Sequence, residues 1–281
     1  MSPRYPLEGV ISWNMNTTCN YRCSYCTQRF VDNRAQWASD LPAFVAAFSG
    51  LAGDWEIKLS GGEPFRHPDF IEAVAGLASG GLRVSVVTNF SASESELRRF
   101  SEVTAGRPGL LSASLHLEYA DPEAFLDKLA WFDDIHSGSV CATCVATGEN
   151  LPLLLDLRER FSARGLRLKV QPEKQDREVI DYTADQLAAL LALGGHNDTG
   201  AIAPSFLGQL CWAGSRYMIV DHRGDAYRCY PSRRYRKEFL GNVLDGSLRL
   251  RNEARPCAYD YCNCTVPQQR GMMEKNHDDR R

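Results

Sequence analysis

The stretch Cys19-Asn20-Tyr21-Arg22-Cys23-Ser24-Tyr25-Cys26 places three cysteines on one short segment with the spacing C-x3-C-x2-C. It follows Val10-Ile11-Ser12-Trp13-Asn14-Met15, an apolar-leaning run that predicts a β-strand. Structural zinc sites normally have four protein ligands, whereas a [4Fe–4S] cluster takes one cysteine per iron. Three thiolates on one loop therefore predict a [4Fe–4S] cluster with one open iron, which is free to bind a substrate or cofactor.

The length of 281 residues fits one large α/β domain with a small appendage. A net charge of −3 provides no basic field, so we expect no nucleic-acid partner. The N-terminus lacks a secretory signal, and no run of apolar residues is long enough to predict a membrane span. The grouped cysteines are typical of metal binding in a reducing compartment, which predicts a cytoplasmic protein. The basic residues at Arg228 and 233–237 predict a solvated face, with contact to an anionic substrate as the alternative.

Six strand–helix units alternate along the first two thirds of the chain. The patterns predict strands over residues 9–15, 55–60, 82–89, 110–116, 139–146 and 166–171. Helices are expected over about 41–48, 67–79, from 93, from 122, over 151–163 and from 184 to about 194. Such alternation indicates a parallel sheet with right-handed crossovers. The polar motifs follow the strand C-termini, where α/β folds place their ligand sites.

The cysteine loop, with Tyr25 before its last cysteine, resembles that of the radical S-adenosylmethionine (SAM) superfamily. The resemblance implies a partial (β/α)6 TIM-like barrel and a cluster bound by Cys19, Cys23 and Cys26. It also implies that the open iron chelates SAM. One electron then cleaves SAM to methionine and a 5′-deoxyadenosyl radical that abstracts a substrate hydrogen. An electron donor such as flavodoxin or ferredoxin is implied as a partner.

A second motif, Gly61-Gly62-Glu63-Pro64, resembles the GGEP segment that holds the amino group of SAM in this family. Two glycines allow a close approach of the backbone to a ligand, and Glu63 offers an acceptor for an ammonium group. Thr88-Asn89-Phe90 stands where the family often has Thr-Asn-Gly. Asn89 is therefore a candidate cofactor contact, with a local turn that differs because Phe90 replaces the glycine.

Further candidates lie at the ends of later strands. Ser114 and His116 share one strand face with Ser112 and are candidates for the ribose or carboxylate of SAM by analogy with the family; a structural role for His116 is the alternative. Gln171 follows the sixth strand and is a less specific candidate. The family's glycine-rich adenine segment is not recognisable in residues 140–148. Cys141 and Cys144 point to opposite faces of one strand, so we expect them in the core.

Beyond a boundary near residues 197–204, the remaining cysteines are Cys211, Cys229, Cys257, Cys262 and Cys264. A hairpin is expected over 216–229, and a short helix after residues 241–247. The segment resembles the SPASM and twitch extensions of radical SAM enzymes, which implies an auxiliary [4Fe–4S] cluster. Five cysteines suffice for one cluster with one to spare, and which of the last three is surplus stays open. A zinc ribbon is the alternative.

We therefore expect a radical SAM core over residues 1–200, a twitch-like cluster domain over 205–266 and a disordered tail over 267–281. The expected function is radical chemistry on a small biosynthetic metabolite, with the auxiliary cluster aiding oxidation or substrate positioning. The first alternative is peptide or protein modification, of the kind that matures ribosomal peptides. Its known members commonly carry an added leader-binding domain, for which the residues before 9 leave no room. The second alternative is a non-catalytic iron–sulfur or zinc protein.

Overall fold

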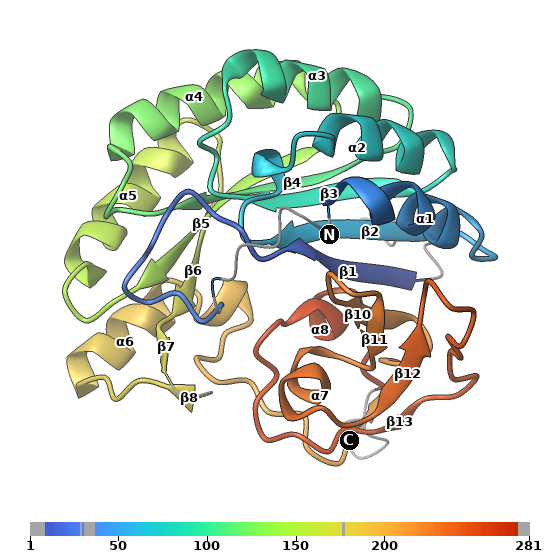
Figure 1. Ribbon diagram of the computed structural model, residues 1–281. Helices are drawn as coiled ribbons and strands as arrows, with labels where there is room; N and C mark the ends of the chain where they lie inside the picture. Colours follow the sequence, from blue (N-terminus) through green and yellow to red (C-terminus); the bar gives the residue numbers. More distant parts are fainter. Residues whose placement is uncertain (1–8, 29, 31–36, 176–177, 275–281) are drawn as a thin grey trace.

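The structure is a computed structural model that describes residues 9–28, 30, 37–175 and 178–274. A nine-stranded sheet runs through it in the order β12-β11-β10-β1-β2-β3-β4-β5-β6. The pairs from β1 to β6 are all parallel. Helices α1 to α5 form an arc over the outer side of these strands, as Figure 1 shows. This is the expected α/β architecture with a partial, open barrel.

The six predicted strand–helix units are confirmed. The strands are β1 (Gly9–Asn16), β2 (Trp55–Gly61), β3 (Arg83–Thr88), β4 (Pro108–Leu115), β5 (Ser139–Ala146) and β6 (Leu168–Pro172). The helices are α1 (Trp37–Ser49), α2 (Phe70–Ser79), α3 (Glu94–Thr104), α4 (Pro122–Ile135), α5 (Leu151–Ala163) and α6 (Ala184–Ala192). Short elements η2 (Pro64–Arg66), β7 (Lys174–Gln175), β8 (Glu178–Val179) and η3 (His196–Asp198) connect them.

Several helices begin at residues that the sequence marks as caps. Ser93 and Glu96 form a capping box at α3, and Thr183 and Gln186 form another at α6. At α4, the side chain of Asp121 accepts a hydrogen bond from the backbone N–H of Ala124, and a proline takes the first helical position. These caps satisfy N–H groups that have no partner inside the helix.

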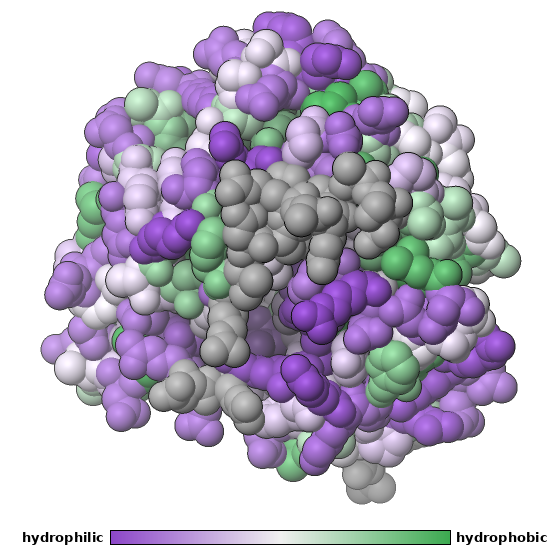
Figure 2. Space-filling view, in the orientation of Figure 1, coloured by the Kyte–Doolittle hydropathy of each residue, from purple (hydrophilic) through white to green (hydrophobic). Residues whose placement is uncertain are grey.

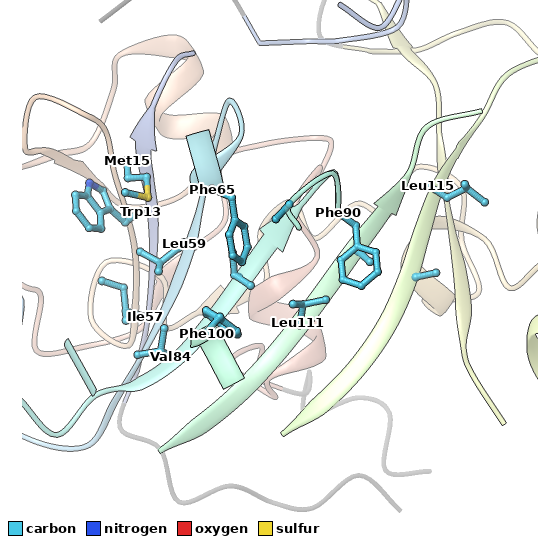
Figure 3. Packing of buried hydrophobic residues seen from close by; sticks show 14 of the residues in the cluster. Trp13, Met15, Ile57, Leu59, Phe65, Val84, Phe90, Phe100, Leu111 and Leu115 are labelled. Atoms are coloured by element: carbon cyan, nitrogen blue, oxygen red, sulfur yellow. The ribbon is translucent and has the colours of Figure 1, made fainter. Parts of the chain in front are cut away.

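The two faces of the strands differ in chemistry. On β2, Ile57 and Leu59 face the helices and belong to the main hydrophobic core, which Figure 3 shows from close by. Because side chains alternate along a strand, Lys58 and Ser60 point to the opposite, concave side. The main apolar core thus lies in the outer layer, and polar side chains share the concave side with a few apolar ones such as Val87 and Val145.

The C-terminal segment continues the main sheet. β10 (Tyr217–Val220) pairs in parallel with β1, and the predicted hairpin is confirmed by its antiparallel pairing with β11 (Asp225–Tyr227). β12 (Phe239–Asn242) adds the outermost strand. The predicted helix after residue 247 is wrong, because residues 248–254 contain no helix. A helix stands instead at α7 (Tyr230–Tyr235), directly after the hairpin.

The predicted disorder of residues 267–281 is wrong for residues 267–274. Val266–Gln269 form α8, and Met273 bridges to Cys211, which ends the short strand β9 (Leu210–Cys211). β9 also pairs with β13 (Arg255–Pro256). Residues 275–281 lie outside the described part of the chain. The apolar side chains of Val266 and Met272 are buried in a second small core, which explains why this segment is ordered.

The sequence predicts a solvated face for the basic residues at Arg228 and 233–237, and this is confirmed for part of them only. Arg236 and Lys237 are exposed, whereas Arg228 is buried and forms an ion pair with Glu238. Figure 2 shows that one face of the molecule is largely hydrophilic, with hydrophobic residues scattered over it. Within the described residues, no helix combines the length and apolar character that crossing a bilayer requires.

Candidate functional site

The three-cysteine loop leaves the C-terminal end of β1 and folds back on itself. The backbone N–H of Cys26 donates to the carbonyl of Cys23 at 3.1 Å, and the N–H of Tyr21 donates to the thiol of Cys19 at 3.3 Å. Burial raises the pKa of Cys19, and raises that of Cys23 to about 11. Each of these two thiols interacts electrostatically with the other and with Cys26. The structure therefore brings the three predicted cluster ligands together.

His116, which follows the end of β4, braces this loop through Tyr25 and Cys23. The Tyr25 hydroxyl lies 3.0 Å from Nδ1 of His116, and the thiol of Cys23 lies 3.3 Å from the same nitrogen. Burial lowers the pKa of His116, which favours the neutral imidazole. Because Nδ1 contacts two loop side chains, His116 belongs to the site rather than to the core alone.

The Gly61-Gly62 pair lets the cysteine loop pack against β2. Gly61 has φ = +134°, and a Cβ on Gly62 would lie 2.0 Å from the carbonyl oxygen of Thr18. The N–H of Gly62 donates to both the backbone carbonyl and the side-chain oxygen of Asn16, at 3.0 and 2.9 Å. The N–H of Glu63 donates to the carbonyl of Thr18 at 2.8 Å. The glycines thus serve a close approach of two chain segments, in addition to any approach to a ligand.

Glu63 ties the same segment to the end of β3. Its side chain is 1% exposed and accepts hydrogen bonds from the Thr88 hydroxyl at 2.7 Å and from the N–H groups of Asn89 and Phe65 at 2.6 and 3.1 Å. Burial raises the pKa of Glu63 to about 7 despite these donors. Both carboxylate oxygens already have partners, so the contact of Glu63 with an ammonium group stays a prediction.

Asn89 and Phe90 complete the turn after β3. The Asn89 side-chain amide donates to the side-chain oxygen of Asn20 at 2.9 Å and to the Cys19 thiol at 3.8 Å. Phe90 has φ = +60° and therefore keeps the left-handed conformation that a glycine would adopt without strain. Its ring is 3% exposed and packs against Phe125 and Phe132. The turn is thus retained, and burial of the ring offsets the strain.

A cavity of about 550 Å³ lies inside the sheet, below the cysteine loop. At its mouth it is bordered by all three loop cysteines and by Gly61 and Gly62. Ser114 and Gln171 line its wall, and the Ser114 hydroxyl is within 3.4 Å of that of Thr143. The predicted site residues of β2, β4 and β6 therefore face one space. Within this wall the sequence reasoning missed Lys58, Lys169 and Lys174, which also line the cavity.

The second cysteine group gathers on the other side of the cavity. Cys211 and Cys229 are buried in the second core beside Tyr217, whose hydroxyl donates to the Cys264 thiol at 3.7 Å. A hydrogen bond joins Cys262 to Cys264 and lowers the pKa of Cys264. Cys257 lies beside β9, where its N–H donates to the carbonyl of Gln209 at 2.8 Å. Cys264 itself reaches the cavity wall.

Among the described residues, neither set of cysteines forms a ready-made site for a single metal ion. Among the residues that the structure describes, no three His, Cys, Asp or Glu side chains converge closely enough to hold one metal ion. A [4Fe–4S] cluster places each thiolate on a different iron, so its ligands need not meet at one point. Cys141 and Cys144 are both buried in β5, and Cys144 belongs to the main core, as predicted.

Arg228 joins the segments that carry the second cysteine group. Its guanidinium donates four hydrogen bonds, to the carbonyls of Ala213, Arg255 and Pro256 at 3.1, 2.7 and 3.1 Å and to the Glu238 carboxylate at 2.9 Å. These carbonyls lie next to Cys211 and Cys257 in the chain, and Arg228 itself precedes Cys229. One buried cation therefore holds three cysteine-bearing segments in place.

Residues 13–136 match the family model described as the Radical SAM superfamily. The chain thus contains a radical SAM domain, which starts within β1 and ends directly after α4. The domain includes the three-cysteine loop, the Gly61-Gly62-Glu63 segment and Asn89. The sequence-based assignment to this family is confirmed for this part of the chain.

Curated proteins match over the same region. The chain is 30% identical over 99 residues to an S-adenosylmethionine-dependent nucleotide dehydratase of Psychrobacter lutiphocae, covering 30% of this chain and 33% of that protein. It is 37% identical over 82 residues to a GTP 3′,8-cyclase of Stenotrophomonas maltophilia, covering 27% of this chain and 25% of that protein. The matches thus span a third or less of these relatives.

Solved structures extend the likeness to most of the fold. SuiB of Streptococcus suis, bound to the precursor peptide SuiA, aligns with a TM-score of 0.59 at 13% identity, covering 85% of this chain and 63% of SuiB. The anSMEcpe structure with bound AdoMet aligns with a TM-score of 0.57 at 16% identity, covering 85% of this chain and 79% of that one. At such identities the likeness concerns the fold, and it confirms the mostly parallel, partial TIM-like architecture.

Proposed function

We propose that this chain is a radical SAM enzyme whose Cys19, Cys23 and Cys26 hold a [4Fe–4S] cluster with one open iron. The observation that carries the proposal is one cavity that borders these three cysteines, the Gly61-Gly62 segment and, on its far side, Cys264. When bound, the cluster and SAM supply a 5′-deoxyadenosyl radical for hydrogen abstraction from a substrate. Both the reacting groups and the substrate would share this cavity, whose volume is in the range of small-molecule sites.

The side chains around the loop would hold SAM and exclude water from it. Ser114, Gln171 and Asn89 present hydroxyl and amide groups to the cavity and are the proposed polar contacts for SAM. His116 and Tyr25 fix the loop through their mutual hydrogen bond. Each of these groups is neutral, so they would contribute hydrogen bonds, whereas Arg22 of the loop adds a positive charge beside Cys19.

We further propose that Cys211, Cys229, Cys257, Cys262 and Cys264 supply the ligands of an auxiliary [4Fe–4S] cluster. The contact of Cys264 with the cavity supports a position for this cluster beside the substrate, where it would aid oxidation or substrate positioning. Burial raises the pKa of Cys211, and that of Cys229 to about 12, so binding iron would release protons from these thiols.

The proposed substrate is a small metabolite, which the cavity volume of about 550 Å³ favours. The curated relatives point the same way, because their names give a nucleotide and GTP as what they act on. A peptide side chain is the second candidate, since SuiB and anSMEcpe have structures with bound peptides. A flavodoxin or ferredoxin in the cytoplasm would supply the electron.

Anaerobic reconstitution with iron and sulfide tests the proposal. About eight irons per chain would correspond to two four-iron clusters, and 5′-deoxyadenosine should form from SAM with a reductant. Replacing Cys19, Cys23 and Cys26 together by Ala should abolish 5′-deoxyadenosine, whereas Cys141→Ala, at a buried cysteine outside both groups, should preserve it. Four irons with 5′-deoxyadenosine would assign the second group to zinc or structure. Stoichiometric zinc without SAM cleavage would refute the enzyme.

A further inference from the structure

The charge of the cavity is one-sided. Five basic side chains line it, namely Arg22, Lys58, Lys169, Lys174 and Arg234, and the described lining residues include no Asp or Glu. The whole chain, by contrast, has 35 acidic and 32 basic residues, so this imbalance is specific to the cavity. An enclosed space of one sign concentrates ligands of the opposite sign.

Two of these cations, Lys58 and Lys169, form no hydrogen bond or ion pair with the residues that the structure describes. Arg22 donates to the carbonyls of Cys19 and Tyr21, and Lys174 donates to that of Asn263. Neither Lys58 nor Lys169 has a hydrogen bond or ion pair among the described residues. An ammonium group that faces an enclosed space without a partner is costly, and a bound anion would remove that cost.

The two lysines face the same interior from different strands. Lys58 lies on β2 and Lys169 on β6, and each repels the other electrostatically across the cavity. Burial, together with this repulsion, lowers the pKa of Lys58. An anion between the two ammonium groups would offset both effects, because it favours the charged form of each.

The carboxylate nearest to Lys58 is already engaged. Glu56 lies two residues earlier on the same face of β2, and it accepts a hydrogen bond from the Ser85 hydroxyl at 2.6 Å and an ion pair from Arg270. The Arg270 contact comes from the residue that follows α8, and Val266 and Gln269 of this helix line the cavity. Glu56 attracts Lys58 electrostatically, but its oxygens are hydrogen-bonded to Ser85 and Arg270 and form no ion pair with Lys58.

The depth of the pair separates it from the SAM end of the cavity. Lys58 precedes Gly61 by three residues, which is about 10 Å along a strand. Lys169 precedes Gln171 by two residues, or about 7 Å. A second molecule with its reacting carbon near the loop would reach the lysine pair with an anionic group at its far end.

We propose that Lys58 and Lys169 form an anion subsite at the floor of the cavity, and that the substrate carries a carboxylate or phosphate group that binds there. This inference rests on the proposed function, because it assigns the floor to the substrate of the radical reaction. The two lysines are binding residues that select for a charged substrate. A neutral sugar or an apolar side chain would leave both ammonium groups unpaired.

The test is calorimetric titration of the reconstituted full chain with inorganic phosphate and, separately, with succinate, in low-chloride buffer. At least one anion should bind, and binding should weaken about 10- to 100-fold in Lys58→Met and in Lys169→Met, as expected for loss of one charged hydrogen bond. Lys58→Arg should retain most of the affinity. Lys237→Met, at an exposed lysine, should match the wild type. Phosphate alone would indicate a phosphorylated substrate, and succinate alone a carboxylate.

The inference is overturned if neither anion binds, or if both bind the Met variants as tightly as the wild type. Folding of each variant is checked by thermal unfolding; loss of a buried, unpaired charge should leave the midpoint equal or higher. Formation of 5′-deoxyadenosine by the wild type, measured without any anion, reports on the proposed function separately. SAM cleavage without anion binding would refute the subsite alone. Anion binding without SAM cleavage would support the subsite and refute the radical enzyme.

Discussion

Replacing Arg228 by Met should destabilise the segments that carry the second cysteine group. The guanidinium is 2% exposed and makes all four of its hydrogen bonds inside the protein. Met keeps the length of the side chain but removes these bonds, and it leaves the half-buried Glu238 with Arg251 and Tyr259 only. Breaking a buried ion pair from one side costs about 3–5 kcal/mol. We expect a loss of about 4 kcal/mol in the free energy of unfolding.

That loss corresponds to a decrease in Tm of about 8–16 °C for a chain of this size. It should be measured by thermal unfolding of anaerobically reconstituted protein. The same variant should lose the iron of the auxiliary cluster, because Arg228 joins the segments of Cys211, Cys229 and Cys257. The iron content should fall from about eight to about four per chain. Formation of 5′-deoxyadenosine should persist, since the three-cysteine loop lies elsewhere.

Arg249→Met is the matched control, because Arg249 is exposed and its guanidinium donates to the neighbouring carbonyls of Gly246 and Leu248. It should change neither Tm nor iron content. Arg228→Lys should resemble Arg228→Met, since an ammonium group lacks the planar fork that reaches several acceptors at once. If Arg228→Met retained both the wild-type Tm and all of its iron, the role assigned to this side chain would be refuted.

Three further predictions concern the segments that surround the cysteine loop, at Gly62, Glu63 and Phe90. Gly62→Ala should displace the cysteine loop, because the new Cβ would lie 2.0 Å from the Thr18 carbonyl oxygen. We expect the iron content of the loop to fall and the free energy of unfolding to drop by about 1–3 kcal/mol or more. An unchanged iron content would contradict this prediction. Burial raises the pKa of Glu63 to about 7, so between about pH 4.5 and 7 the folded protein keeps a proton that the unfolded chain loses. The free energy of unfolding should therefore fall by up to about 3 kcal/mol as the pH rises through this range. Denaturant titrations of Glu63→Gln should not show this dependence on pH. Phe90→Gly relieves backbone strain of about 1–3 kcal/mol but removes a buried ring that contributes about 3–5 kcal/mol to the free energy of unfolding. We therefore expect chemical unfolding to show a net loss of stability.

The order of strands and helices could be predicted because each unit carries local signals. Asp121-Pro122 marks the start of α4, and Ser93 and Thr183 cap α3 and α6. The pairing of β10 with β1 carries no such signal, because it joins residues about two hundred positions apart. The ordered segment 267–274 was missed for a similar reason. Its few apolar side chains, such as Met272, gain burial only from a core that distant segments create.

The candidate site could be predicted from the sequence where a residue type has one main role, as the cysteines have in binding metal. Three closely spaced cysteines indicate a metal centre without knowledge of the fold, and the structure places them on one loop. Gly61 and Gly62 were expected to make room for a ligand, whereas they also make room for Thr18 and Asn16. Phe90 was expected to alter the turn, yet it keeps a positive φ because its ring is buried against α4. Both outcomes depend on contacts between separate segments.

The inner face of the sheet could be read in part from the strands themselves. Strands covered on both faces are nearly continuous apolar runs, whereas Glu56-Ile57-Lys58-Leu59-Ser60 alternates strictly, and so does Leu168-Lys169-Val170-Gln171. Alternation in a parallel strand indicates that its second face borders a polar space. It does not show that Lys58 and Lys169 border the same space, because that depends on the curvature of the sheet from β2 to β6. Once the curvature is known, two like charges in one cavity without a carboxylate among its described lining residues favour an anionic ligand, with the Cys264 thiol as the acidic group of the lining that interacts with Lys58.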